Sequence, residues 1–294
     1  MRALLVCNPH AGGVHGEAAL ASIERRLRLA RVEPERVPGA DPSSVCANLQ
    51  AALRGARPDE ARVICIGGDG TINGILPALV GTGFPLAIIP AGTFNALAGE
   101  LGIPRDVGCA VSVALTGRPR RIDIGLANGK PFCQIAGAGF DAAAVHTVLP
   151  QRNKNLLSPA ALVRGLRLLA GYRSPWVRVT ADGIVLESRA WLALIANASM
   201  YTYSIRAAPG ARVDDALLDL WLFEGRTPAY AARQVAAILR GRAGAAAGAR
   251  RVQAREIRLA SDPRMFLHCD GDAAGTTPAE FEVVPGALTV FVPA

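Results

Sequence analysis

A glycine-rich turn directly after a buried strand places the strongest constraint on how this chain can fold. Residues 62–66 (RVICI) are apolar and do not alternate with polar residues, a pattern typical of a strand that is covered on both faces. The sequence GGDGTIN follows, from Gly67 to Asn73, and an apolar segment at helical spacing comes next, with Thr71 as the expected helix N-cap. This pattern predicts a strand–turn–helix unit of a parallel α/β sheet.

The residue types in this turn suit a phosphate group. Glycine tolerates a positive φ and lets a ligand approach the backbone closely, and the N-terminus of a helix presents free N–H groups to an anion. The single carboxylate, Asp69, fits a divalent metal that arrives with a nucleotide. A tight turn that binds nothing is the alternative. The turn therefore predicts a nucleotide phosphate site.

The chain divides into two halves with different patterns. Strands alternate with helices over about the first 120 residues, which favours a parallel sheet. Antiparallel signals dominate afterwards, with hairpin turns expected at Asn128-Gly129 and Asp182-Gly183 and a turn into the last strand at Pro285-Gly286. We expect an α/β nucleotide-binding domain over residues 1–124 and a mainly antiparallel, β-rich domain over residues 125–294. The last strand is a candidate to return to the first domain.

The basic charge of the chain is concentrated in one stretch. Lys and Arg outnumber Asp and Glu by 32 to 24, which gives a net charge of +8. The arginines of this stretch are Arg226, Arg233, Arg240, Arg242, Arg250, Arg251, Arg255 and Arg258. They suit peripheral contact with an anionic membrane, and a solvated arginine face is the alternative. Nucleic acid is not an expected partner, because aromatic residues make up only 5% of the chain.

Cysteine usage and hydropathy predict a cytoplasmic protein. The six cysteines are scattered without a CxxC pair, which is typical of reduced thiols. The apolar segment before Asn8 is too short for a signal peptide, and no run reaches the roughly 20 apolar residues of a membrane span. Any membrane contact is therefore expected to be peripheral.

One further glycine motif and the histidines are not expected to take part in catalysis. The segment AGAGFDAAAV, residues 136–145, contains the dinucleotide-like spacing G-x-G-x-x-A. No acidic residue lies between Asp141 and Asp182 to hold a ribose, so a dinucleotide site is disfavoured. His268 lies in an expected strand and is interpreted as structural.

Seven segments in a consistent order resemble the diacylglycerol kinase catalytic-domain family, which includes bacterial lipid kinases, ceramide kinases and sphingosine kinases. The segments are NPHAGG (8–13), GGDGTIN (67–73), PAGTFNALAGELGIP (90–104), RIDIG (121–125), AGAGFDAAAV (136–145), APGARVDDALLDLWLF (208–223) and HCDGDAAG (268–275). The resemblance covers nearly the whole chain. It implies a nucleotide domain like those of NAD kinases and phosphofructokinases, followed by a β-rich lipid kinase domain. It also implies transfer of the γ-phosphoryl group of ATP to the hydroxyl of a diacylglycerol-like or sphingoid-like lipid.

The resemblance implies roles for individual residues as well. Asp272 would be the general base, and Asp69 would act on a catalytic Mg²⁺ through water. ATP would be bound by Asn8, Pro9, His10, Ala11, Gly12, Gly67, Gly68, Asp69, Gly70, Thr71, Ile72, Asn73 and Thr93. A structural Mg²⁺ would be held by Arg212, Asp215 and Leu217.

The chain departs from the family pattern at four positions. Gly74 and Ala96 replace the glutamate and aspartate of many members, Ala216 replaces a glycine, and Asp272 replaces the usual glutamate. Because the base position stays acidic, activity is expected. An NAD kinase-like small-molecule kinase and a catalytically inactive nucleotide- or lipid-binding protein of the same fold remain alternatives. The sequence also leaves open whether the chain forms homo-oligomers.

Overall fold

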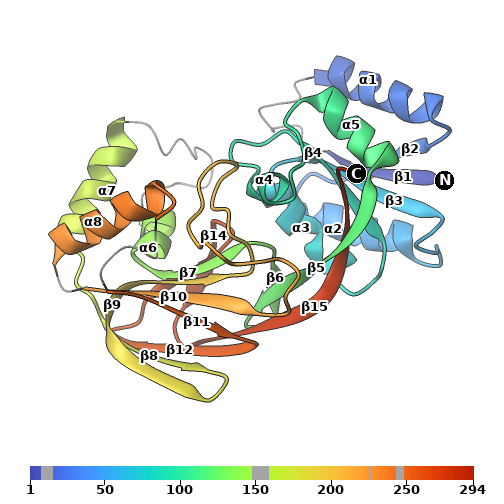
Figure 1. Ribbon diagram of the computed structural model, residues 1–294. Coiled ribbons are helices and arrows are strands. Elements are labelled where there is room, and N and C mark those ends of the chain that lie inside the picture. The colour runs from blue at the N-terminus through green and yellow to red at the C-terminus, as the bar shows by residue number, and fades with distance from the viewer. Residues whose placement is uncertain (8–15, 148–158, 226, 243–247) are drawn as a thin grey trace. The chain divides into compact units, whose positions relative to one another are not determined.

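The computed structural model describes five ranges of the chain, which form two compact units (Figure 1). These ranges are 1–7, 16–147, 159–225, 227–242 and 248–294. The first unit comprises Met1–Ile124, Thr202–Ser204 and Val284–Ala294. The second unit comprises Gly125–Tyr201 and Ile205–Val283. Each unit is described by itself.

The first unit contains a parallel sheet with helices on both faces. Its elements are β1 (Arg2–Cys7), α1 (Gly16–Leu29), β2 (Glu33–Arg36), α2 (Pro42–Leu53), β3 (Ala61–Gly67), α3 (Asp69–Leu79), β4 (Pro85–Pro90), α4 (Ala96–Glu100) and α5 (Val107–Thr116). It also contains the start of β5 (Arg118–Ala127) and the end of β15 (Ala279–Val292). The strand order is β2-β1-β3-β4-β15, and these neighbours pair in parallel. Helices α1 and α5 cover one face, and α2 and α3 cover the other (Figure 1). This confirms the expected α/β architecture.

The central strand explains why the apolar run does not alternate. All seven residues of β3 are buried, because helices cover the sheet on both sides. The helix that follows begins at Asp69 with Gly68 as its N-cap, so the prediction of Thr71 as N-cap is wrong. Its apolar residues Ile72, Ile75, Leu76 and Leu79 recur at helical spacing and are buried. The short strand β2 and the helix α5 were not predicted from the sequence pattern.

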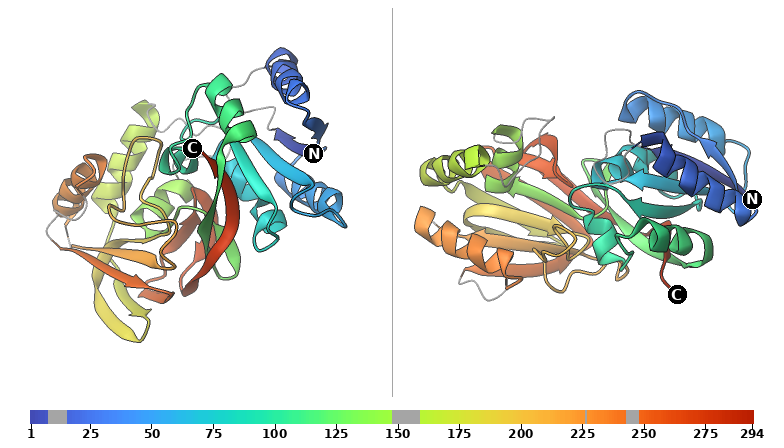
Figure 2. Two further views of the ribbon diagram at one scale, coloured as in Figure 1. Left: turned by 45° about the vertical axis from the view of Figure 1, so that its right-hand side comes forward. Right: turned by 90° about the horizontal axis from the view of Figure 1, so that it is seen from above.

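The second unit is built from antiparallel strands. Its elements are β6 (Lys130–Phe132), β7 (Ile135–Gly139), α6 (Phe140–Thr147), α7 (Pro159–Gly171), β8 (Trp176–Ala181), β9 (Ile184–Ala196), β10 (Leu218–Glu224), α8 (Pro228–Leu239), β11 (Ala249–Ala254), β12 (Glu256–Asp262), β13 (Phe266–Cys269) and β14 (Asp272–Thr276). The long strand β9 pairs with β8 along its first half and with β7 and β10 along its second half. Figures 1 and 2 show α6, α7 and α8 on one face of β7, β9 and β10.

Strand β10 shows how these layers share the core of the second unit. Leu218, Leu220 and Leu222 join the cluster that packs with β8 and β12. The intervening residues Trp221 and Phe223 belong to a second cluster that includes Ala231 of α8. Since both faces of β10 are buried, its sequence is almost continuously apolar.

Two of the three predicted turns are confirmed. Asn128-Gly129 has φ values of 49° and 77°, and Asp182-Gly183 has values of 43° and 86°, as a type I′ hairpin turn requires. The predicted turn at Pro285-Gly286 is wrong, because β15 continues through it from Ala279 to Val292. Within the first unit, the Gly286 N–H donates to Asp123 Oδ1 at 2.7 Å and its carbonyl accepts from Arg121 Nε at 3.0 Å. These bonds hold the segment in the sheet.

The arginine-rich stretch is divided between ion pairs and exposed side chains. Arg251 pairs with Asp219, whose side chain is fully buried, and also donates to the Gly210 carbonyl at 3.0 Å. Arg250 pairs with Glu224 at 3.2 Å. Arg233 and Arg240, on and directly after α8, are exposed. No helix in the described ranges is both long enough and apolar enough to span a membrane.

Candidate functional site

The glycine turn of the first unit joins β3 to α3. Gly68 has a φ of −104°, and neither Gly67 nor Gly70 adopts a positive φ, so left-handed backbone is not the reason for these glycines. The Gly68 carbonyl accepts from Thr71 N–H at 2.9 Å and Ile72 N–H at 3.2 Å. The first N–H groups of any α-helix have no acceptor within the helix itself. The turn therefore presents a helix N-terminus of the kind that binds anions.

Close approach of a second loop explains Gly68. A Cβ on Gly68 would lie 2.9 Å from Gly92 Cα, and a Cβ on Gly92 would lie 2.4 Å from Gly68 Cα. The Asn95 side chain braces the second loop: its Oδ1 accepts from Gly92 N–H at 2.9 Å, and its Nδ2 donates to the Gly92 carbonyl at 2.7 Å. The loops that contain Gly68 and Gly92 are thus packed backbone to backbone.

Gly70 has a different environment. It is exposed, and a Cβ at this position would meet no described atom within 4 Å. No packing requirement in the described part of the chain therefore accounts for a glycine here. A glycine here leaves the first turn of α3 open to a ligand.

Asp69 connects the glycine turn to α4. Its two carboxylate oxygens accept from the N–H groups of Ala96 at 3.1 Å and Leu97 at 3.2 Å. These are the first N–H groups of α4, whose N-cap residue, Asn95, makes no side-chain cap of its own. Asp69 therefore caps α4 from a distance, and the Ala96 backbone contributes to this contact although its side chain carries no carboxylate.

The other predicted nucleotide residues differ in how far the structure describes them. Asn73 is half-buried, and its Oδ1 is buried without a hydrogen-bond partner among the described residues. Such an acceptor suits a donor from a ligand or water. Thr93 is exposed on the loop that contains Gly92, whereas Ile72 is buried in the core. Asn8, Pro9, His10, Ala11 and Gly12 lie outside the described residues.

An acidic hairpin in the second unit contains the predicted base. Asp270 and Gly271 form the turn between β13 and β14, with φ values of 48° and 83°. The Asp270 carboxylate accepts three backbone N–H groups, from Cys133 at 2.7 Å, Gln134 at 3.0 Å and Ile135 at 2.9 Å. Asp272, at the start of β14, is exposed. The Asp270 carboxylate thus anchors the turn through backbone hydrogen bonds, whereas Asp272 is exposed to solvent.

A buried histidine lies beneath this turn. His268 Nε2 is 2.8 Å from Asp141 Oδ2, and His268 Nδ1 accepts from the Gly271 N–H at 3.3 Å. Asp141 belongs to the first turn of α6, and its Oδ1 accepts from Ala142 N–H at 2.6 Å. The pKa of His268 is lowered by burial, but the Asp141 carboxylate and, more weakly, those of Asp270 and Asp272 outweigh burial and raise it above its ordinary value.

Gly137 makes room for this histidine–aspartate pair. It pairs with His268 across β7 and β13. A Cβ on Gly137 would lie 2.2 Å from Asp141 Oδ2 and 2.3 Å from His268 Nε2. The first glycine of the dinucleotide-like spacing is thus explained by packing within the second unit.

The segment predicted to hold a structural Mg²⁺ forms a tight turn. Asp215 Oδ1 accepts from Leu217 N–H at 3.2 Å, and Ala216 between them has a φ of 60°. Arg212 forms an ion pair with Asp214 at 3.2 Å. One carboxylate with backbone carbonyls is a hard-oxygen donor set of the type that Mg²⁺ accepts. No group of three or more His, Cys, Asp or Glu side chains suited to a metal occurs in the described ranges.

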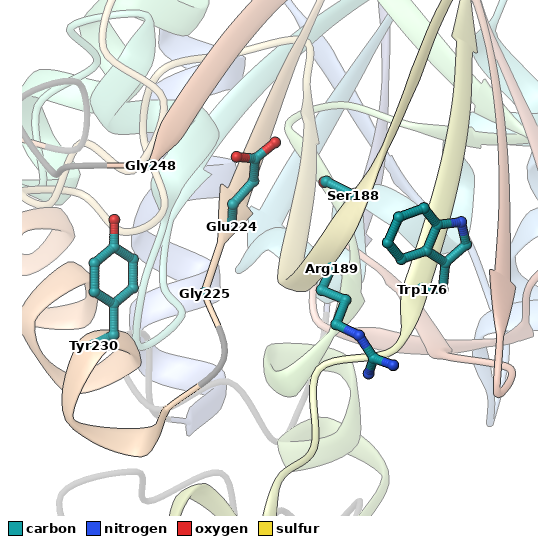
Figure 3. A pocket seen from close by; sticks show the side chains of 7 residues that line it. All are labelled: Trp176, Ser188, Arg189, Glu224, Gly225, Tyr230 and Gly248. Atoms are coloured by element: carbon teal, nitrogen blue, oxygen red, sulfur yellow. The ribbon is translucent and has the colours of Figure 1, made fainter.

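A pocket of about 360 Å³ lies elsewhere in the second unit (Figure 3). Its lining residues are Trp176, Ser188, Arg189, Glu224, Gly225, Tyr230 and Gly248. None of the predicted site residues is among them. Glu224, one of the lining residues, is paired with Arg250.

The sequence interpretation missed three features of these sites. It did not assign a role to Gly92 or Asn95, although both lie in the quoted segment PAGTFN. It did not connect His268 with Asp141. A histidine two residues before an Asp-Gly turn was the available signal, but its partner is 127 residues away along the chain.

Comparisons with known proteins agree in both halves of the chain. The diacylglycerol kinase catalytic domain matches residues 2–127, and the YegS C-terminal NAD kinase beta sandwich-like domain matches residues 134–292. A diacylglycerol kinase of Bacillus subtilis is 29% identical over 298 residues, covering 99% of this chain and 96% of that protein. An uncharacterized Synechocystis protein is 30% identical over 237 residues, which are 79% of this chain and only 54% of that relative.

Solved structures show the same fold. The crystal structure of a diacylglycerol kinase from Bacillus anthracis matches with a TM-score of 0.72 at 21% identity, covering 99% of this chain and 96% of that one. A second structure, of a putative diacylglycerol kinase from the same organism, matches with a TM-score of 0.74. At this identity the likeness supports the architecture and not the choice of substrate.

Proposed function

Because this chain belongs to the diacylglycerol kinase catalytic-domain family, we propose that it is an ATP-dependent lipid kinase that phosphorylates a lipid hydroxyl. The observation that carries the proposal is the open first turn of α3. Gly70 is exposed there, and a Cβ on it would meet no described atom within 4 Å. A helix N-terminus with its backbone uncovered is suited to the phosphates of a nucleotide. The acceptor is proposed to be diacylglycerol-like or sphingoid-like.

The residues of the first unit would bind and orient the nucleotide. Backbone N–H groups at the start of α3 would hold phosphate oxygens, and Asn73 Oδ1 would accept a hydrogen bond from the ligand. Mg²⁺, when bound, neutralises the negative charge that repels the attacking oxygen. Asp69 would hold that ion through water, because both carboxylate oxygens already accept backbone N–H groups. Asp215 and the carbonyls of Arg212 and Leu217 would hold a structural ion.

Asp272 is proposed as the general base of the second unit. Its exposed carboxylate would accept the proton of the lipid hydroxyl as the oxygen attacks the γ-phosphorus and the bond to ADP breaks. Asp270 is a poor candidate for the same role, because three backbone N–H groups occupy its carboxylate. The hairpin thus contains one aspartate that fixes the turn and one, exposed, that is proposed to accept the proton.

The proposed activity is tested by incubating the purified chain with labelled ATP and a total lipid extract. We expect the label to appear in a phospholipid, and identification of that product names the acceptor. NAD without lipid, offered in a parallel reaction, tests the small-molecule kinase alternative. Label transferred to NAD alone would favour that alternative, and no transfer to any acceptor would favour a binding protein.

We also propose that the protein works in the cytoplasm, on the surface of an anionic membrane. Helices α7 and α8 contact each other in the second unit. Four exposed arginines lie on or next to these helices. They are Arg164 and Arg167 of α7, Arg233 of α8 and Arg240 directly after α8. Exposed arginines near an anionic surface contribute about 1 kcal/mol each. Arg250 and Arg251 are poor reporters of this contact, because both are engaged in ion pairs.

Reversing Arg233 and Arg240 to glutamate should weaken adsorption to phosphatidylglycerol vesicles and leave binding to phosphatidylcholine vesicles unchanged. Each reversal lowers the net charge by two, so the pair takes it from +8 to +4. Reversing the exposed Arg25 and Arg54 of the first unit makes the same change elsewhere and serves as the matched control. Vesicle sedimentation over a salt series measures the effect. An equal loss of vesicle binding in both double variants would show that the interaction depends only on the net charge of the protein.

A further inference from the structure

We infer that His268 is a positioning residue that couples its own protonation to the shape of the turn before Asp272. This inference rests on the proposed function, since it concerns how the general base is held. The observation behind it is a continuous chain of contacts in the second unit. It runs from the Gly271 N–H to His268 Nδ1, and from His268 Nε2 to Asp141 Oδ2.

The two contacts define one protonation state of the imidazole. A backbone N–H can only donate, so the Gly271 bond at 3.3 Å requires an unprotonated Nδ1. The proton of the neutral ring then lies on Nε2, from which it is donated to Asp141 at 2.8 Å. The turn geometry therefore corresponds to neutral His268.

Protonation would remove one of the bonds that hold the turn. A proton on Nδ1 would face the Gly271 N–H, and two donors cannot form a hydrogen bond. Asp270 would still anchor its own side of the turn through three backbone N–H groups. Gly271 would lose its hydrogen bond to the His268 side chain, and Asp272 is the next residue. Loss of the bond therefore acts directly on the position of the proposed base.

The carboxylates around His268 raise its pKa above the ordinary value. The charged groups around it in the described ranges are Asp141 of α6 and, from its own hairpin, Asp270 and Asp272. The facing strand β7 contributes Gly137, which has no side chain. His146 of α6 lies nearby, with its Nε2 3.0 Å from the Leu267 carbonyl. Together the three carboxylates favour the charged imidazole, against the neutral state that the Gly271 bond requires.

Alternative roles explain the arrangement less well. A histidine that only filled space would not need its two ring nitrogens bonded to Asp141 and Gly271, as they are here. Gly137 leaves room for this orientation, because any Cβ there would collide with the polar atoms of both His268 and Asp141. His268 is itself only 1% exposed, so it is not placed to contact a substrate. The absence of a side chain at Gly137 makes room for the His268–Asp141 pair, and His268 in turn contacts the hairpin turn at Gly271.

Two substitutions separate the contacts of His268. His268→Asn places an amide oxygen near the site of Nδ1 and so keeps an acceptor for Gly271, without a titratable group. His268→Gln places an amide nitrogen near the site of Nε2 and keeps the donor to Asp141, but gives up the contact with Gly271. We expect His268→Gln to lower kcat about tenfold, with KM for ATP unchanged, because a displaced catalytic group loses rate rather than nucleotide affinity.

The pH profile gives a readout that a purely structural role would not move. The parent enzyme should lose kcat on acidification through the titration of His268, whose ordinary pKa is about 6.5 and is raised here. His268→Asn should keep kcat near the parental value at about pH 8 and lack this loss on acidification. His146→Asn, at an exposed histidine of the same unit, should retain the parental profile.

Magnetic resonance of the imidazole nitrogens tests the coupling without any assay of activity. The parent should show His268 as the Nε2–H tautomer, and the Gly271 amide resonance should move as His268 titrates. An Nδ1–H tautomer, or a Gly271 resonance that ignores the titration, would overturn the inference. So would parental pH profiles in both variants, or equal losses of kcat and melting temperature in both. If the parent phosphorylates no lipid, the proposed function fails, and the resonance experiment still decides the coupling.

Discussion

Asp272→Asn is expected to lower kcat by roughly 10² to 10⁴ while ATP binding stays nearly intact. Asparagine has the size of aspartate but cannot accept the proton of the lipid hydroxyl. Because Asp272 is exposed at the start of β14, the substitution should leave the fold unchanged. Steady-state kinetics with a lipid acceptor, together with an ATP-binding isotherm and a melting curve, measure the three expectations separately.

Two matched variants sharpen this prediction. Asp272→Glu keeps the carboxylate and should retain substantial activity, as expected from the glutamate that is usual in the family. Asp270→Asn changes the neighbouring aspartate, whose carboxylate accepts three backbone N–H groups. It should lower the melting temperature, because an amide oxygen and an amide nitrogen cannot replace two acceptors. A well-folded Asp272→Asn enzyme with the parental rate would remove Asp272 from the mechanism.

The sequence could predict elements whose signals are local. The run RVICI and the following glycines predicted β3, the turn and α3, because burial on both faces leaves a continuous apolar pattern. The Asn-Gly and Asp-Gly turns were predictable because few residues adopt the required positive φ. The turn at Pro285-Gly286 failed, since bonds from Asp123 and Arg121 keep this segment in β15. Those partners lie more than 160 residues away along the chain.

The candidate sites were only partly predictable for the same physical reason. The glycines indicated that another group packs closely against the turn. They did not indicate that Gly68 packs against the loop containing Gly92, whereas Gly70 has open space beside it. That distinction depends on Gly92, which lies on the loop after the neighbouring strand β4. Likewise, the spacing of Gly137, Gly139 and Ala142 resembled a dinucleotide fingerprint. Only the pairing of β7 with β13 reveals that His268 fills the space beside Gly137.

Because Gly70 is open and Gly68 is packed against Gly92, a large loss of ATP affinity without a loss of stability is expected at Gly70. Gly70→Val should weaken ATP binding about a hundredfold, equivalent to ~2.7 kcal/mol, because the side chain would occupy the space at the first turn of α3 where the phosphates are proposed to bind. Stability should change little, since a Cβ at Gly70 meets no described atom within 4 Å and glycine is itself a poor helix former.

Gly68→Val is the matched comparison, with the same change of side chain two residues earlier. Its Cβ would lie 2.9 Å from Gly92 Cα, so the two loops must separate and the melting temperature should fall. Both variants are thus expected to lose ATP affinity, but only Gly68→Val should lose stability as well. Calorimetric titration with ATP and thermal melting of each variant distinguish the cases. A Gly70→Val protein that binds ATP as tightly as the parent would show that the open turn is not the phosphate site.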